Sequence, residues 1–189
     1  MNSVELQNPI LKDLVTHADD RGLLTECCRV DWEEVVTDIR QVYIVRNHSK
    51  GTIRAFHCHN ELIDYFNIVQ GAAKFILFHH DKMKEMYNEW YRKQGNDIGE
   101  AVLYPSHEYA RKEFVKEFSE TEWYQEYTLT DKQMQMLYIP PRWMHGWMSL
   151  EDGTMLLSNA SDVFNPDKID CKRIEWNLLG ENIWPIKFK

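Results

Sequence analysis

The sequence predicts an all-β sandwich or barrel that is interrupted by one helical insertion. Three observations support this fold class. The 189 residues amount to one domain. Short runs of β-branched and aromatic residues recur with turn residues between them. Seven Trp, nine Tyr and eight Phe supply the large side chains of a β-rich core. We therefore expect a single domain over 1–189, with the insertion at 79–122.

Each predicted strand is bounded by turn residues. Asp20-Arg21-Gly22 and Gln70-Gly71 are turn signals, and Pro140-Pro141 is a rigid turn. The runs before the insertion that read as strands are 39–46, 52–59, 65–69 and 72–78. After it, the β pattern resumes at 124–130, 134–139, Met148, 154–159 and 173–176.

The insertion has the spacing of helices. Residues 83–94 and 106–118 are rich in charge, and their apolar residues recur at helical intervals. Ser106 is a candidate N-cap for the second helix. The simpler expectation is a surface excursion or a dimer element, and the sharper one is a lid that excludes water from a reaction.

Charge and composition exclude several classes of partner. Asp and Glu total 30 against 22 Lys and Arg, so the formal net charge of -8 argues against nucleic acid and anionic membranes as partners. The sequence contains no run of 18 apolar residues and no secretory signal. The four cysteines form no C-x-x-C pair, so we expect reduced thiols and a cytoplasmic protein.

A group of histidines has the most informative spacing in the chain. His57 and His59 are two residues apart on a predicted strand, so both side chains point to one face. Asp64 begins the next strand, and His145 follows Pro140 by five residues. Three imidazoles and one carboxylate that converge inside a barrel would suit a divalent metal, namely Zn, Mn, Fe, Ni or Co.

This spacing resembles the two signature motifs of the cupin superfamily. The first, G-x5-H-x-H-x3,4-E-x6-G, matches Gly51 to Gly71 with Asp64 in place of Glu. The second, P-x-G-x2-H, matches Pro140 to His145 with Arg142 in place of Gly. The resemblance implies a double-stranded β-helix, the jelly roll of the cupins.

A second resemblance covers most of the chain outside the insertion. The matching segments lie in the same order as in the dTDP-4-dehydrorhamnose 3,5-epimerase family. They are Asp20–Glu26, Asn47–Ser49 with Gly51–His57, Ile139–Gly146, Asp162–Pro166, and Ile174–Asn177 with Ile183–Pro185.

This second resemblance implies an enzyme that moves a proton next to the ketone of a nucleotide-activated 4-keto-deoxysugar. It also implies a homodimer. His57 matches the base of that family, and Arg21 and Arg54 match arginines that bind the nucleotide diphosphate. The further pocket residues that it implies are Glu26, Asn47 and His145.

The chain departs from the epimerases at several functional positions. Leu178 stands where they have an Asp that orients the base, and Ser158 stands near the position of their tyrosine acid. Val45 replaces a Gln, and Asp64 replaces a Lys. The resemblance to the epimerases therefore predicts the fold and the substrate class better than it predicts the 3,5-epimerisation reaction.

Two related groups account better for the paired histidines. Arg54–His59 resembles R-G-x-H-A-H of the dTDP-sugar 3,4-ketoisomerases, in which two histidines act as acid and base. The span from His57 to Asp64 resembles H-x-H-x4-E in the metal-binding cupin domain of capsular UDP-sugar reductase-epimerases.

These two options make opposite demands on His57. Without metal, His57 or His59 is the base and Asp64 can orient it. With metal bound by His57, His59, Asp64 and His145, the base must be another group or a metal-bound water. The other candidate groups are Tyr65, Tyr138 and Glu61.

Two functions from other classes stay open beside the isomerase. One is a metal-dependent cupin enzyme that acts on another small polar substrate, which the four-ligand spacing motivates. The other is a non-catalytic sugar-binding cupin, which the missing Asp and tyrosine acid motivate.

Overall fold

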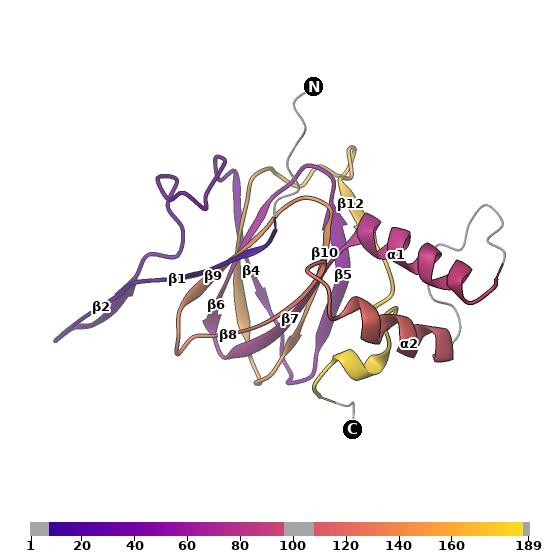
Figure 1. Ribbon diagram of the computed structural model, residues 1–189. Coiled ribbons are helices and arrows are strands. Elements are labelled where there is room, and N and C mark those ends of the chain that lie inside the picture. Colours follow the sequence, from indigo (N-terminus) through magenta and orange to yellow (C-terminus); the bar gives the residue numbers. More distant parts are fainter. Residues whose placement is uncertain (1–7, 97–107, 187–189) are drawn as a thin grey trace.

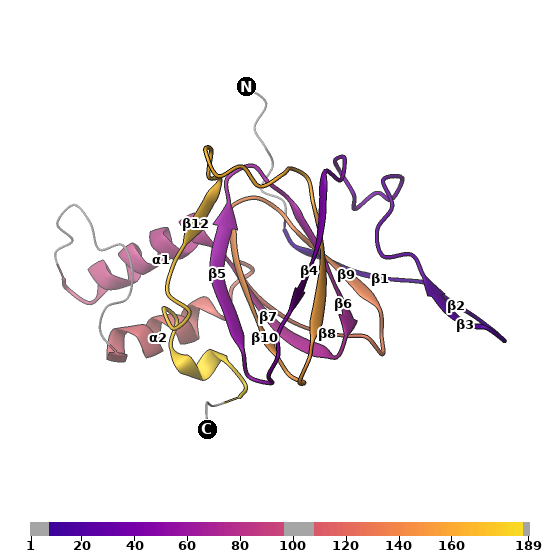
Figure 2. The same cartoon turned by 180° about the vertical axis from the view of Figure 1, so that it is seen from behind.

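The computed structural model describes residues 8–96 and 108–186. Two five-stranded antiparallel sheets face each other, with a separate two-stranded hairpin beside them (Figures 1 and 2). The first sheet has the order β1 (Ile10–Asp13), β9 (Gln135–Ile139), β6 (Asp64–Gln70), β11 (Met155–Ala160), β4 (Gln41–Arg46). The second has the order β12 (Cys171–Arg173), β5 (Ile53–His59), β10 (Trp143–Ser149), β7 (Ala72–His79), β8 (Tyr124–Thr130). This arrangement confirms the predicted jelly roll.

Alternation along the strands divides the apolar side chains among three clusters. Because successive strand residues face opposite sides, Phe75 and Leu77 of β7 lie between the sheets, whereas Ile76 and Phe78 face outward. The outward cluster of the second sheet is covered by the helices. A third cluster lies on the outer face of the first sheet, where Val35 packs with Tyr65 and Tyr138.

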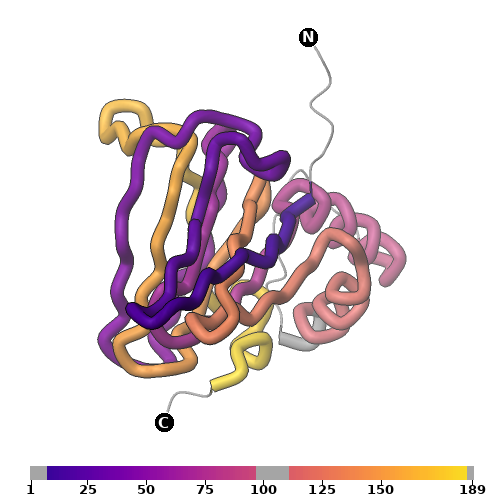
Figure 3. The backbone as a smooth tube through the Cα atoms, turned by 90° about the vertical axis from the view of Figure 1, so that its left-hand side faces the viewer, coloured from indigo at the N-terminus to yellow at the C-terminus, as the bar shows by residue number. Residues whose placement is uncertain are grey.

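The helical insertion is confirmed, and it packs against the outer face of the second sheet. It contains α1 (His80–Lys93) and α2 (Glu108–Phe118), both on one side of the strands (Figure 3). Tyr87, Trp90 and Phe114 are buried there, with the rings of Tyr87 and Phe114 centred 5.1 Å apart. Neither of these helices is long and apolar enough to cross a membrane.

The helix α1 begins three residues earlier than its spacing predicts. The Nδ1 atom of His79 accepts the backbone N–H of Lys82 at 3.4 Å and so caps the first turn. The predicted N-cap Ser106 lies outside the described residues.

The predicted strands agree with the observed ones apart from their ends, except that β10, Trp143–Ser149, was predicted only at Met148. The final strand, predicted at 173–176, is β12 at Cys171–Arg173, although Ile174 still exchanges two backbone hydrogen bonds with Phe56. The sequence pattern missed β1 and the hairpin of β2 (Thr16–Asp19) and β3 (Gly22–Thr25). The hairpin extends away from the two sheets (Figure 1). A short 3-10 helix, Glu181–Ile183, lies near the C-terminus.

Candidate functional site

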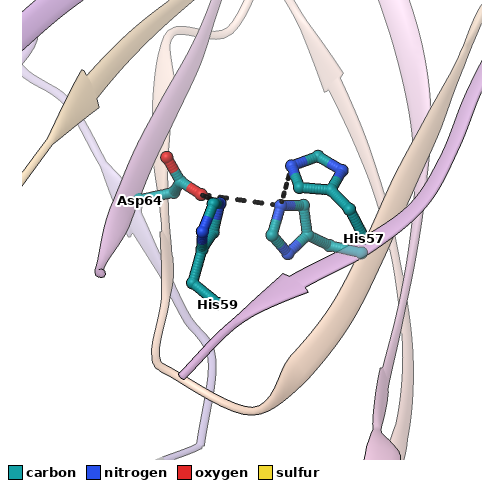
Figure 4. Close-up of side chains that lie close together, drawn as sticks. His57, His59 and Asp64 are labelled. Atoms are coloured by element: carbon teal, nitrogen blue, oxygen red, sulfur yellow. Dashed lines mark hydrogen bonds and ion pairs between the residues drawn. The ribbon is translucent and has the colours of Figure 1, made fainter. Parts of the chain in front are cut away.

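Three histidines and one aspartate meet between the two sheets. His57 and His59 face inward from β5. The residues that alternate with them, Phe56 and Cys58, face outward and pack into the cluster that the helices cover. His145 on β10 is the direct strand partner of His57. Asp64 reaches the same place from β6 of the opposite sheet (Figure 4). One ligand atom from each of the four residues lies within 4.8 Å of all the others.

A glycine allows β10 to approach β5 closely. A Cβ atom at Gly146 would lie 2.2 Å from the Cβ of Ala55, so only glycine fits between the two strands. The pairing register shifts at this point, between His145 and Trp147. The close approach therefore sets how near His145 lies to His57.

Hydrogen bonds orient two of the imidazoles. The Nδ1 atoms of His145 and His59 lie 3.0 and 2.9 Å from the carbonyl oxygens of Trp143 and Asp170, so each carries its proton on Nδ1. Both Nε2 atoms are then lone-pair acceptors. That of His145 lies 3.0 Å from Nε2 of His57, which donates its proton to it. Backbone carbonyls that hold Nδ1–H in this way are typical around metal-binding histidines.

Burial dominates the electrostatics of the cluster. It lowers the pKa of His57 to about 4, with a smaller contribution from electrostatic repulsion by His59 and Arg173, and it lowers the pKa of His59 and of His145. Burial raises the pKa of Asp64 to about 7. Asp64 lies 3.6 Å from Nε2 of His59 and 3.5 Å from Nε2 of His145, but at neutral pH these contacts join a carboxyl group to uncharged rings rather than forming ion pairs.

The cluster is reached from two cavities. The first, of about 360 Å³, is lined by His57 together with Tyr43, Arg54 and Arg173. The second, of about 330 Å³, is lined by His59 and by the segment Ser161–Cys171. A larger cavity of about 670 Å³ lies between α2 and residues 177–183 and includes none of the cluster residues. No described residue of α1 or α2 lines either of the first two cavities.

The first cavity has one predicted substrate-binding residue in its wall, and a second is hydrogen-bonded to that residue. Arg54 lines the cavity, and its Nε donates to Oδ1 of Asn47 at 2.7 Å. Asn47 is buried and is anchored in turn by its Nδ2 to the carbonyl of Thr52. Arg54 is therefore held in place by a neighbour from the loop that precedes β5.

Other predicted site residues lie elsewhere in this chain. Arg21 is at the tip of the β2–β3 hairpin, where its side chain is 90% exposed and pairs with Asp19. Glu26 pairs with Arg29 at 2.7 Å on the surface. The structure does not bring either of the predicted residues Arg21 and Glu26 to the cluster.

The candidate bases of a metal-bound site also lie apart from the cluster. Tyr138 pairs with Tyr65 in the first sheet. Both belong to the third cluster, on the outer face of that sheet, whereas Asp64 points to the inner face. The hydroxyl of Tyr65 there accepts the backbone N–H of Val36. Glu61 is largely exposed at the rim of the second cavity.

Two residues that line the first cavity were not predicted from the sequence. Tyr43 on β4 lies opposite Ser158 on β11, so a phenol from the neighbouring strand stands next to the position where the epimerases have their tyrosine acid. The period of two in 39–46 was the available signal, since it places Tyr43 and Val45 on one face, and both line the cavity. Arg173 ends the three-residue strand β12, which is too short to give a pattern.

Comparison with known proteins gives one curated relative of nearly equal length. The spore coat polysaccharide biosynthesis protein SpsL of Bacillus subtilis (strain 168) is 27% identical over 182 residues, which cover 95% of this chain and 96% of that protein. No protein-family model matches the sequence.

The solved structures with the same fold include sugar-nucleotide enzymes. The dTDP-4-dehydrorhamnose 3,5-epimerase of Bacillus anthracis str. Ames matches with a TM-score of 0.65 and 16% identity, over 96% of this chain and 87% of that chain. The sugar 3,4-ketoisomerase QdtA of Thermoanaerobacterium thermosaccharolyticum matches with a TM-score of 0.56 and 19% identity, over 94% and 95% of the two chains. The chain thus has the jelly-roll cupin fold of the dTDP-4-dehydrorhamnose 3,5-epimerases and the dTDP-sugar 3,4-ketoisomerases, as its motifs predicted.

Proposed function

We propose that this chain is an isomerase or epimerase of a nucleotide-activated 4-keto-deoxysugar, built as one cupin domain over 1–189. The observation that carries the proposal is the first cavity, in which His57 lies beside two arginines, Arg54 and Arg173. Guanidinium groups suit the oxygens of a diphosphate. The solved structures of this fold include one with TDP and pyrophosphate bound, and the curated relative is a polysaccharide biosynthesis protein.

The chemistry follows from the protonation states of the cavity residues. His57 is uncharged at neutral pH, because burial lowers its pKa to about 4. As a base it takes the proton from the carbon next to the ketone, and the electron pair of that C–H bond moves onto the ketone oxygen. Burial and the charge of Asp64 raise the pKa of Tyr43, so its phenol stays protonated and can donate to the enolate oxygen. Return of a proton to the other face, or to another carbon, completes the reaction.

Solvent isotope exchange tests this proposal. We expect the purified protein to incorporate deuterium at a ring carbon of a dTDP- or UDP-4-keto-6-deoxy sugar in deuterated water. His57→Asn should lower the rate at least 100-fold while the protein still binds TDP. The matched control is His48→Asn, a histidine on the exposed loop before β5. Absence of exchange with every sugar nucleotide would contradict an isomerase, and binding without exchange would favour the sugar-binding alternative.

A second candidate function, a metal-dependent enzyme, is favoured by a separate observation. His59 and His145 present lone pairs on Nε2, and Asp64 and His57 complete a set of four donors within 4.8 Å. This set fits Zn, Mn, Fe, Ni or Co. Such a metal would act as a Lewis acid on a bound oxygen. His57 would then be a ligand, and among the tyrosines considered as proton donors or acceptors Tyr43 lines the cavity whereas Tyr65 and Tyr138 do not.

Elemental analysis separates these two versions of the site. A stoichiometric metal that is lost in His57→Ala and in His145→Ala would favour the metal-dependent enzyme, on this or another small polar substrate. An active protein that retains full exchange after chelation would favour His57 as the base.

We also propose that the protein is a cytoplasmic homodimer. Val42 and Ile44 on the edge strand β4 are 58% and 60% exposed, and Leu23 and Leu24 on the extended hairpin are 77% and 61% exposed. Unpaired apolar edges of this kind are typical of subunit contacts. A hairpin that packs on the second copy would bring Arg21 to that copy. The four cysteines are free, as is usual in the cytoplasm. Light scattering of Leu23→Ser/Leu24→Ser should give a monomer.

A further inference from the structure

Arg142 occupies a backbone position that normally needs glycine. It lies in the turn between β9 and β10, with a φ of 72°, a left-handed conformation that side chains other than glycine rarely adopt. It is also the residue that replaces the glycine of the second cupin motif. An arginine in this conformation implies that its surroundings hold it there.

The backbone of Arg142 connects the insertion to the candidate site. Its N–H donates to the carbonyl of His59 at 2.8 Å, and its carbonyl accepts the N–H of His80 at 3.1 Å. His59 is a member of the cluster, His80 is the first residue of α1, and His145 follows Arg142 by three residues. The turn thus touches both histidine-bearing strands and the insertion.

The side chain of Arg142 is held by the first turn of α1. Its Nε donates to Oδ2 of Asp81 at 3.0 Å, and its Nη2 donates to the same oxygen. Its Nη1 lies 3.4 Å from Oδ1 of Asn60, the residue after His59. The other oxygen of Asp81 lies 3.0 Å from Nδ1 of the buried His80. Asp81 therefore links Arg142 to the N-terminal end of α1.

We propose that Asp81 is a positioning residue of the candidate site: through Arg142 it holds the end of β5 and the turn before β10, and so fixes His59 and His145 relative to each other. This inference rests on the proposed role of the four-residue cluster. It assigns the insertion a part in the site although no described residue of α1 or α2 lines the first or the second cavity. Loss of a direct partner of a site residue typically costs about 10- to 100-fold in affinity or activity, and Asp81 acts one step further out, so the lower end, about 10-fold, is expected.

The test follows the two imidazoles directly, by ¹⁵N NMR of the histidine side chains in the full-length protein. In Asp81→Asn we expect the ring nitrogens of His59 and His145 to shift toward a mixture of tautomers, because the end of β5, which carries His59, and the turn before Trp143, whose carbonyl is the partner of His145, are no longer held in place. Zn²⁺ affinity should fall about 10-fold where the wild-type protein binds the metal. The control is Glu85→Gln, which removes an exposed ion pair with Lys82 on the same helix and should leave both rings unchanged.

A double variant separates positioning from a general effect on the helix. In an Arg142→Gly background, Asp81→Asn should cause no further change in the two imidazoles, since the carboxylate then has no guanidinium to hold. An equal effect of Asp81→Asn in both backgrounds, or unchanged imidazoles in the single variant with a normal unfolding midpoint, would overturn the proposal. Both readouts are independent of turnover, so a failure of the proposed isomerase activity is seen separately in the exchange assay.

Discussion

The buried carboxyl of Asp64 should make the metal-free protein less stable as the pH rises. Its pKa is about 7 in the folded protein against 3.8 for the ordinary group. Because the folded state binds the proton more tightly, ionisation opposes folding, and the penalty grows from about pH 4 and is complete above pH 7. A shift of this size corresponds to about 4 kcal/mol. Asp64→Asn removes the charge and keeps the shape, so we expect it to stabilise the metal-free protein by roughly 2–4 kcal/mol at pH 8.

Urea unfolding after chelation, at pH 8 and at pH 4, measures this effect. The advantage of Asp64→Asn should be largest at pH 8 and small at pH 4, where both forms of residue 64 are uncharged. Asp167→Asn, at an exposed position, is the control and should change the unfolding free energy by less than about 0.5 kcal/mol. A variant less stable than the wild type at pH 8, or a difference that does not depend on pH, would refute the reasoning.

Three further predictions concern the cavity and its walls. Gly146→Ala places a Cβ 2.2 Å from that of Ala55, so it should lower the free energy of unfolding by about 1–3 kcal/mol in thermal or urea melts; an unchanged melt would show that the strands separate freely. Arg173→Ala should raise KM for the sugar nucleotide about 10-fold with little change in kcat, measured by isotope exchange, and a kcat effect alone would argue against a binding role. If His57 is the base, the acid limb of kcat/KM should fall near pH 4, where His57 becomes protonated, rather than near pH 6.5.

Local pattern was sufficient to predict most strands of the two sheets and part of the candidate site. The period of two placed His57 and His59 on one face, and the spacing of Asp64 and His145 placed them near the same point. The resemblance to cupins added the prediction of a double-stranded β-helix. The shared face of His57 and His59 depends on short-range geometry, which a sequence carries directly, whereas the place of His145 beside His57 depends on the pairing of β5 with β10.

The residues that could not be predicted depend on long-range pairing. Tyr138 was a plausible catalytic group until its pairing with Tyr65 placed it on the outer face. Tyr43 reaches the cavity because β4 pairs with β11, a partnership between segments more than 100 residues apart. The position of Arg21 depends on the direction of a hairpin that extends away from the two sheets (Figure 1). A sequence pattern specifies none of these relations.

The division of the cluster between the two sheets has a mechanical consequence. His57, His59 and His145 stand on one wall, which is stiffened from behind by α1 and α2, and Asp64 stands alone on the other. Any molecule or ion that bonds to Asp64 and to an imidazole at the same time therefore cross-links the halves of the sandwich. Binding should then raise resistance to unfolding of the whole β domain, and thermal shift with candidate ligands becomes a direct screen for the occupant of the site.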